Sequence, residues 1–184
     1  MSSALVLSQI RSEHLPAIIA LHRSAMEGFI TGIDQDKDEG DLRDIERFYF
    51  RDGGDFLVGS FDGQVVAMGG LKRHTKTTAE IKRMRIDKLH QGRGFGTQLL
   101  AALEQRAIDL GIQTLHLQTA STRVLAMKFY RKHGYEQVGQ GRYGDVETTR
   151  FAKSINASPI VPLEQATANE TIHSTAESPT GIRP

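Results

Sequence analysis

The chain has 184 residues and a nearly balanced charge, with 23 Lys and Arg against 22 Asp and Glu and a formal net charge of +1. A protein that binds mainly nucleic acid normally carries a clear positive excess, so this balance argues against nucleic acid as the partner. The chain contains no Cys, which excludes disulfide bonds, a thiol nucleophile and a thiolate zinc site. The length suits one domain with a sizeable core.

The N-terminal segment predicts neither export nor membrane insertion. It has no basic stretch, and its apolar run breaks at Ser8 and Gln9. Such a run is too short for the apolar part of a signal peptide or for a membrane span. We therefore expect a cytoplasmic protein with no membrane partner.

Strand and helix patterns alternate along the first half of the chain. Residues 4–10 predict a strand, and Ser12 is expected to cap a helix that ends near Met26. Residues 40–50 predict a shorter helix. Three strands follow, with a hairpin turn at Asp62-Gly63 between the first two, over residues 56–61, 65–71 and 78–86.

The second half predicts two helices and three strands. The first helix starts near Thr97 and ends at Gly111, and its apolar face is made of Leu99, Leu100, Leu103, Ala107 and Leu110. The later elements are a strand over 114–119, a helix over 123–132 and strands near 135–139 and 146–151. Together these elements predict a single α/β domain with a mixed sheet over residues 4–153.

The composition changes at the C-terminal end. Four of the five prolines lie beyond residue 153, and no aromatic residue follows Phe151. A segment of this kind buries too little apolar surface to offset its ordering entropy. Residues 154–184 therefore predict a disordered tail, either a spacer or a docking or regulatory segment.

A glycine-dense turn, Gln91-Gly92-Arg93-Gly94-Phe95-Gly96, joins a predicted strand to a predicted helix. Glycines let the backbone N–H groups approach a ligand closely, and a helix N-terminus favours an anion. The turn therefore predicts a phosphate site. A tight turn without a ligand is the alternative.

Two common phosphate loops do not fit this turn. The Walker loop requires Lys and then Ser or Thr after its last glycine, whereas Thr97 and Gln98 follow Gly96. The dinucleotide fingerprint requires a third glycine at position 97 and an acidic residue about 20 positions later. The next strand ends instead in Gln118 and Thr119.

The turn resembles the acyl-coenzyme A loop of the GNAT superfamily of N-acetyltransferases, whose pattern is Gln or Arg, any two residues, Gly, any one residue, and Gly or Ala. Gln91, Gly94 and Gly96 match it. Upstream, residues 79–86 resemble the superfamily's fourth strand. Downstream, residues 126–135 resemble the later motif, with an Ala and a Tyr four apart before Gly and an aromatic residue.

This resemblance implies a mostly antiparallel sheet splayed around an acyl-coenzyme A cleft, about four flanking helices, and acetyl-coenzyme A as co-substrate. The strand 84–86 would pair through its backbone with the pantetheine amides. Arg93 would add a cation to the pyrophosphate, and Lys132 would approach the adenosine phosphate or face water. The implied cofactor-binding residues are Met84, Arg85, Ile86, Gln91, Gly92, Arg93, Gly94, Phe95, Gly96, Thr97, Ala126 and Lys132.

The resemblance also implies two catalytic residues. Glu80 occupies the position of the general base in several relatives, where it acts directly or through water. A surface carboxylate beside Lys82 and Arg83 is the alternative. Tyr130 matches a tyrosine that lies near the coenzyme sulfur and protonates or holds it, and a half-buried packing residue is the alternative.

Position 123 departs from the family pattern. An Asn that helps to hold the pantetheine arm often stands there, and this chain has Arg123. Thr119 or Thr122 would then substitute through a hydroxyl. We expect Arg123 to face water rather than to approach a coenzyme phosphate.

An acidic segment lies between the first two predicted helices. It contains Asp34, Asp36, Asp38, Glu39 and Asp41, with only Lys37 against them. It predicts a solvated loop or an attraction for a cationic amine. The pattern lacks the later carboxylate and the helices of a calcium-binding EF-hand, so we expect no metal.

These features favour transfer of an acetyl group from acetyl-coenzyme A to a primary amine of a small, amino-acid-like molecule, by direct attack in a ternary complex. A transferase acting on a protein N-terminus or lysine is one alternative. A non-catalytic acyl-coenzyme A sensor is another, although it would require neither Glu80 nor Tyr130. A homodimer is possible.

Overall fold

The structure, a computed structural model, describes residues 4–27 and 39–155 of the chain. Seven strands form one sheet in the order β1-β2-β3-β4-β5-β7-β6. The strands are β1 (Val6–Gln9), β2 (Asp55–Phe61), β3 (Gln64–Arg73), β4 (Thr78–Ile86), β5 (Thr114–Ala120), β6 (Glu136–Tyr143) and β7 (Val146–Ser154). The helices are η1 (Ser12–His14), α1 (Leu15–Met26), α3 (Gly40–Arg43), η2 (Glu46–Phe50), η3 (Lys88–His90), α4 (Phe95–Asp109) and α5 (Val124–Lys132).

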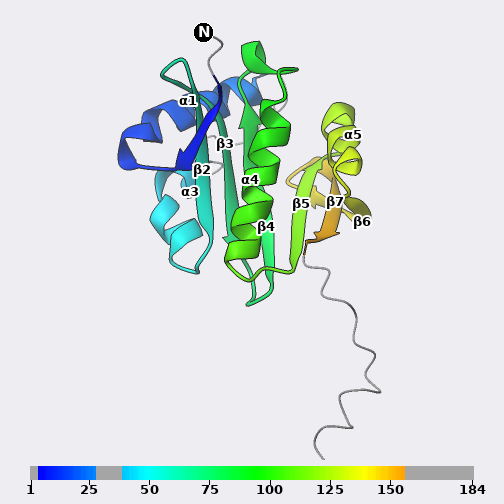
Figure 1. The fold of residues 1–184 in the computed structure, drawn as a ribbon. Helices are drawn as coiled ribbons and strands as arrows, with labels where there is room; N and C mark the ends of the chain where they lie inside the picture. Colours follow the sequence, from blue (N-terminus) through cyan, green and yellow to red (C-terminus); the bar gives the residue numbers. More distant parts are fainter. Residues whose placement is uncertain (1–3, 28–38, 156–184) are drawn as a thin grey trace, which may run out of the picture.

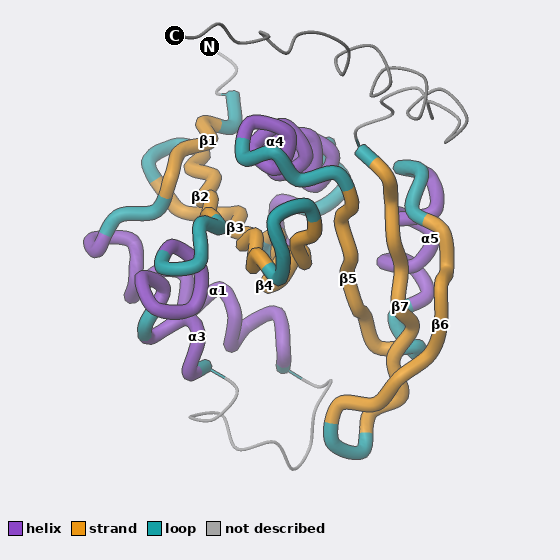
Figure 2. The backbone as a smooth tube through the Cα atoms, turned by 90° about the horizontal axis from the view of Figure 1, so that it is seen from below, coloured by secondary structure: helices purple, strands orange, loops and turns teal. Residues whose placement is uncertain are grey.

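The sheet is mixed, because β4 and β5 run parallel while every other neighbouring pair is antiparallel. The chain runs through its elements in the order drawn in Figure 1. Figure 2 shows α4 on one face of the sheet and α1 with α3 on the other, with β5, β7 and β6 forming a separate wing beside β1–β4. This arrangement confirms the predicted α/β domain with a mostly antiparallel sheet.

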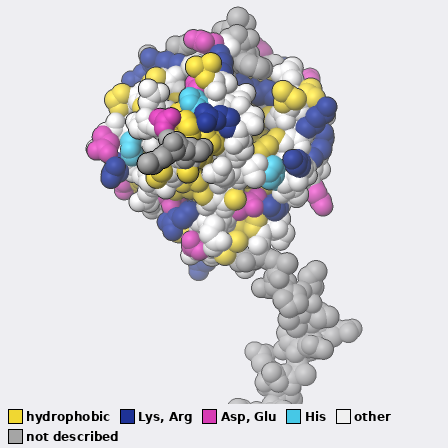
Figure 3. Space-filling model, turned by 45° about the horizontal axis from the view of Figure 1, so that its top comes forward, with side chains coloured by type: hydrophobic (Ala, Val, Ile, Leu, Met, Phe, Trp, Pro, Cys, Tyr) yellow, Lys and Arg dark blue, Asp and Glu magenta, His cyan; other side chains and the backbone are white. Residues whose placement is uncertain are grey.

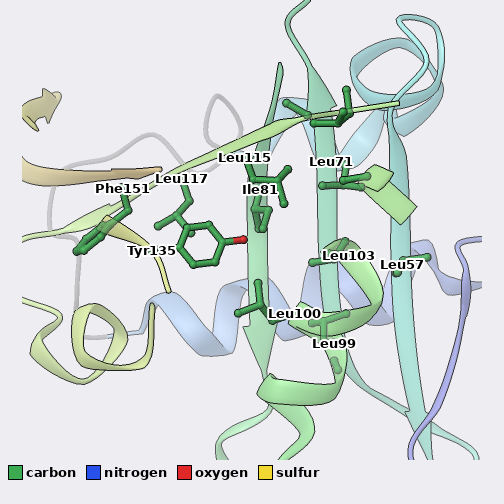
Figure 4. Packing of buried hydrophobic residues seen from close by; sticks show 14 residues of the cluster. Leu57, Leu71, Ile81, Leu99, Leu100, Leu103, Leu115, Leu117, Tyr135 and Phe151 are labelled. Carbon is green, nitrogen blue, oxygen red and sulfur yellow. The ribbon is translucent and has the colours of Figure 1, made fainter. Parts of the chain in front are cut away.

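Each face of the sheet has its own core. The core under α4 extends across to β7, and Figure 4 shows Leu99, Leu100 and Leu103 directed at strand residues from Leu57 to Phe151. A second core joins α1, α3 and η2 to β2 and β3 around Ile18, Leu42 and Tyr49. Each fully buried Leu or Ile contributes roughly 1.5–3 kcal/mol, so both layers are held firmly to the strands between them.

Two local predictions are wrong. Ser12 does not cap the first helix but lies inside a short 3-10 turn, where the backbone N–H of Arg11 donates to Nδ1 of His14 at 3.0 Å. The predicted helix over 40–50 is two pieces, because Asp44 leaves the helical region and its side chain accepts from the backbone N–H of Arg47 at 3.1 Å. The side chains of His14 and Asp44 each accept a backbone N–H, and such local bonds compete with the regular helix.

The ends of the domain also differ slightly from the expectation. Strand β7 continues to Ser154, and the N–H of Ile155 donates to the carbonyl of Gln113 at 2.9 Å. The sheet therefore includes one residue beyond the predicted limit at 153, and Ile155 is fixed to the loop before β5 by its hydrogen bond. Residues 156–184, on which the tail prediction rests, lie outside the described residues. Within the described part of the chain, no helix combines the length and the apolar character that a membrane span requires.

Candidate active site

Strands β4 and β5 pair over only part of their length. Their parallel register joins residues 78–81 to residues 114–117 and stops at Ile81 and Leu117. On its other side, β4 stays paired with β3 as far as Ile86. The backbone edge of residues 82–86 that faces β5 therefore has no neighbouring strand among the described residues. This is the edge that the sequence predicts for pairing with the pantetheine amides.

A β-bulge reverses the alternation of β4 in this region. Across from the single Gly69 of β3, β4 carries two residues, Arg83 and Met84. Arg83 has a left-handed backbone with φ of 55°, which is unusual for a residue other than glycine. The extra residue turns Arg83 and Arg85 toward α1, while Met84 packs in the core on the α4 side.

The predicted glycine turn forms the start of α4. Gly92 and Gly94 have φ of 75° and 83°, and open space surrounds the position of a side chain at both. The first helical hydrogen bond runs from the N–H of Gln98 to the carbonyl of Gly94. The N–H groups of residues 95–97 precede this bond and so lack an acceptor within the helix. They fit an anion such as a coenzyme pyrophosphate.

Aromatic contacts anchor the turn to the sheet. The guanidinium of Arg93 lies over the rings of Phe61 and Phe95, at 4.3 and 5.2 Å from their centres, and His90 stacks on Phe95. Gln91 donates from Nε2 to the carbonyl of Ile86 at 3.2 Å. These contacts hold the turn beside the end of β4. They give Arg93 and Gln91 a positioning role in addition to the predicted contact with the coenzyme.

The remaining predicted cofactor residues lie near α5. Thr97 Oγ1 is 3.2 Å from Nε2 of His133, which ties the first turn of α4 to the end of α5. Gly96 lies next to Phe129 of the same helix. Ala126 is partly buried in α5, whereas Lys132 is exposed in its last turn.

Tyr130 is held at the core side of the unpaired β4 edge. Its hydroxyl donates to Sδ of Met84 at 3.7 Å, and its ring packs against Tyr135 and Phe151. Burial raises the pKa of the Tyr130 hydroxyl, while the charges of Arg85 and Arg123 act in the opposite direction. The hydroxyl therefore stays protonated and can serve as a proton donor.

Glu80 lies on the opposite face of β4, in the part that is still paired with β5. Its carboxylate is 3.2 Å from Nε2 of His74 and 3.7 Å from Nζ of Lys82, and the side chain is 22% exposed. Because the bulge adds one residue to β4, Glu80 and Met84 oppose Lys72 and Gly69 of β3, three residues apart, which corresponds to about 10 Å at a rise of about 3.3 Å per residue. The structure thus places Glu80 and Tyr130 at different levels and on different faces of β4.

A charged network occupies the α1 side of β4. Arg83 donates to both carboxylate oxygens of Asp41, and the hydroxyl of Tyr49 also donates to Asp41, at 2.5 Å. Burial by itself raises the pKa of the Asp41 carboxyl, but the hydrogen bonds and charge of Arg83 outweigh it and the pKa lies below its usual value. The buried His22 lies beside Arg83, with Nε2 at 3.4 Å from Nη1.

This network corrects the expectation for two residues of the acidic segment. Glu39 is held by Arg23 at 2.6 Å and by Arg43 at 3.1 Å, and Asp41 is held by Arg83. Both carboxylates are therefore already paired with arginines and are not available to attract a cationic amine. Asp34, Asp36 and Asp38 lie outside the described residues.

Arg123 is only partly exposed and contacts α1, whereas the sequence predicted a side chain that faces water. It is partly buried at the start of α5, and its Nη2 donates to the carbonyl of Ala25 at 3.3 Å and to Sδ of Met26 at 3.6 Å. Burial lowers the pKa of its guanidinium, whereas the nearby Tyr130 acts to raise it. The only sequence signal for this placement was the departure from the family's Asn. No sequence signal marked the partly buried position of Arg83, because a charged residue next to Lys82 looks like an ordinary exposed strand residue.

A further hollow lies apart from these residues. It is an open groove of about 600 Å³ between α1 and the β2–β3 turn, lined among others by His14, Ser24, Gly63 and Asp87. It contains none of the predicted site residues. In the part of the chain that the structure describes, no group of three or more acidic or His side chains is arranged to hold a metal ion.

Comparisons with known proteins agree with this arrangement. A sequence model of the acetyltransferase (GNAT) family matches residues 16–135. The human N-acetylaspartate synthetase is 30% identical over 101 residues, which cover 54% of this chain and 33% of that protein. The chain thus spans only about a third of the length of such curated relatives.

Solved structures show the same fold. A GNAT acetyltransferase from Staphylococcus aureus superposes with a TM-score of 0.76 at 24% identity, over 83% of this chain and all of that one. An acetyltransferase from Salmonella typhimurium, solved with its cofactor acetyl-CoA, gives 0.66 at 17% identity, over 84% of this chain and 95% of that one. Because the family model covers most of the chain, the protein belongs to the GNAT acetyltransferase family.

Proposed function

We propose that the protein transfers an acetyl group from acetyl-coenzyme A to the primary amine of a small, amino-acid-like molecule. Family membership supports acetyl transfer from acetyl-coenzyme A. The name of the human relative makes an amino acid derivative the product of that enzyme, which supports an amino-acid-like acceptor here. The ribosomal-protein-S18-alanine N-acetyltransferase of Escherichia coli shares this fold, so a protein N-terminus or lysine is the second candidate acceptor.

The observation that carries the proposal is the combination at the end of β4. An unpaired strand edge over residues 82–86 meets a helix start whose N–H groups at residues 95–97 precede the first helical bond. A long ligand with amide groups at one end and phosphates at the other matches both features. Residues 84–86 would bind its amides, and the turn from Gln91 to Thr97 would bind its pyrophosphate.

Acetyl-coenzyme A supplies an activated acetyl group in a thioester. The amine must lose a proton as its nitrogen bonds to the acetyl carbon and the carbon–sulfur bond breaks. Because Glu80 lies about 10 Å along the strand from Met84 and on its other face, we propose that it takes this proton through water rather than directly. Tyr130, protonated and in contact with Met84, would give its proton to the departing thiolate or hold it by a hydrogen bond.

A pair of glycine variants tests the coenzyme site. Gly94 and Gly111 both have positive φ and open space around a side chain, but Gly111 lies just beyond the opposite end of α4. Alanine at either position carries the same backbone strain of roughly 1 kcal/mol. Gly94→Ala should weaken coenzyme A binding, measured by calorimetry, at least tenfold more than Gly111→Ala does.

Coenzyme A binding and thiol release, measured together, distinguish the proposed small-molecule transferase from a sensor and from a protein-modifying enzyme. Equal coenzyme A affinity in both variants would remove the turn from the proposal. Coenzyme A binding in the wild type without thiol release from acetyl-coenzyme A, whichever amine or peptide is added, would instead favour the sensor. Thiol release with peptides and not with small amines would favour the protein-modifying alternative.

A further inference from the structure

A hydrogen bond joins the end of α5 to the first turn of α4. Nε2 of His133 lies 3.2 Å from Oγ1 of Thr97. Thr97 is exposed, and its backbone N–H is one of those that precede the first hydrogen bond of α4. The contact therefore brings an imidazole to the turn that the proposed function assigns to the coenzyme pyrophosphate.

The other ring nitrogen of His133 determines which hydrogens the imidazole carries. Nδ1 lies 2.8 Å from the carbonyl oxygen of Phe129, which can only accept, so Nδ1 carries a hydrogen. In a neutral imidazole Nε2 then has no hydrogen and accepts from the hydroxyl of Thr97. In the charged imidazolium Nε2 has a hydrogen and donates to Oγ1 of Thr97. A single proton therefore reverses the direction of the bond between α5 and α4.

The direction of this bond decides what the Thr97 hydroxyl does next to a ligand. When His133 is neutral, the hydroxyl hydrogen is held by Nε2. When His133 is charged, the hydroxyl hydrogen is available to an anion beside the N–H groups of residues 95–97, and the positive charge attracts the same anion. Anion binding and protonation of His133 therefore strengthen each other, because such coupling is reciprocal.

We propose that His133 takes up a proton from solvent when the coenzyme binds, and that through Thr97 it makes the affinity for the coenzyme depend on pH. This inference rests on the proposed function, since it adds a residue to the same coenzyme site. A histidine suits this role because imidazoles change charge near neutral pH.

The charged groups around His133 do not fix its charge state. It caps the C-terminal end of α5, where the last backbone carbonyls favour a cation. Arg131 and Lys132 precede it and oppose another positive charge. Lys153 of β7 passes beside the next residue, but its ammonium group is paired with Glu104 of α4 at 2.8 Å. Among the described residues, the polar contacts of the ring go to a hydroxyl and a carbonyl, not to a carboxylate.

Proton uptake on binding is measurable without catalysis. Dephospho-coenzyme A is a clean probe, because its pyrophosphate stays ionised, whereas the phosphomonoester of coenzyme A itself titrates near about pH 6. Titration calorimetry near pH 7, in buffers of different ionisation enthalpy, should show uptake of a fraction of one proton per ligand. The affinity should fall about threefold to tenfold as pH rises from 6 to 8.5, because the charge on the imidazole is lost.

Variants test the two residues. His133→Gln should abolish the proton uptake and make the affinity nearly constant over this pH range, and its difference from the wild type gives the same quantity with coenzyme A. Thr97→Val should lose most of the pH dependence, whereas Thr97→Ser, which keeps a hydroxyl, should retain it. His116→Gln is the control, because His116 lies opposite Glu80, far along β4 from the turn, and it should change neither quantity.

The failures are distinct. Binding without proton uptake, or with the same uptake in His133→Gln, would overturn this inference and leave the proposed acetyl transfer intact. Equal pH dependence in Thr97→Val and the wild type would show that the hydroxyl does not transmit the effect and would also overturn it. Absence of coenzyme A binding would remove both this inference and the proposed function. Thermal unfolding of each variant at each pH shows whether a loss comes from misfolding.

Discussion

The two faces of β4 are built by different means. On the α4 side, the site consists of backbone N–H groups, small residues and apolar side chains around Met84 and Tyr130. On the α1 side it consists of ion pairs and charged side chains such as Asp41, Arg83 and Arg85. The first face suits a long ligand bound through the protein backbone. The character of the second face depends on single side chains.

The described surface at the end of the molecule that carries the glycine turn has no large field of one charge (Figure 3). Figure 3 shows Lys and Arg side chains scattered among apolar, acidic and neutral groups on that face rather than gathered in one field. Charge there serves local contacts, such as the stacking of Arg93 on two aromatic rings. Recognition of a specific ligand must therefore come from the geometry of particular groups.

The largest expected effect concerns proton removal on the α1 side. Glu80→Gln should lower kcat by about 10² to 10⁴, because a positioned general base is typically worth that much. The loss should be partly rescued at high pH, where the acceptor amine deprotonates by itself. Steady-state rates from pH 6 to 10 measure this, with the exposed Glu136→Gln as control. Full activity with an unaltered pH profile would rule out Glu80 as the base.

A stability effect of similar free energy is expected for the charged network on the same face. Asp41→Asn breaks the ion pair with Arg83, whose side chains are only 11% and 13% exposed. The free energy of unfolding should fall by about 3 kcal/mol, or roughly 6–12 °C in Tm. Thermal unfolding of this variant beside Asp145→Asn, an exposed turn residue, measures the difference.

The same variant gives a prediction on pH. Because the folded-state pKa of Asp41 is lowered, its contribution is complete above the unfolded value of about 4 and is lost as pH falls through the folded value. The stability gap between the wild type and Asp41→Asn should therefore narrow below about pH 4. A gap that is constant from pH 7 to pH 2 would show that the carboxylate charge does not stabilise the fold.

The smallest effect is expected on the α4 side. Tyr130→Phe should lower kcat by about 10 to 10², since a thiol with a reference pKa near 8.5 leaves fairly well without an acid. Coenzyme A affinity should be unchanged, and high pH should restore little activity. The exposed Tyr143→Phe is the control. A loss of kcat larger than that of Glu80→Gln would show that the α4 side contributes more to the rate than the α1 side.

Local features of the chain were predictable because local rules govern them. The glycine turn has the positive φ angles that its glycines allow, and the predicted C-cap Gly111 accompanies the hydrogen bonds of a Schellman motif, from Gly111 to Ile108 and from Ile112 to Ala107. The predicted strands pair in one mixed sheet. Where the prediction failed, near Ser12 and at Asp44, a side chain that the sequence did not single out accepts a backbone N–H, namely His14 from Arg11 and Asp44 from Arg47.

The sequence by itself determined the element order, the phosphate-type turn and the family resemblance, since each depends on residues close together in the chain. The α1 side of the site depended on the tertiary structure. The bulge at Arg83 inserts one residue into β4 and so reverses which side chains face α1, which no strand pattern reveals. Arg123 reaches a carbonyl 98 positions away in the chain, because the start of α5 lies beside the last turn of α1.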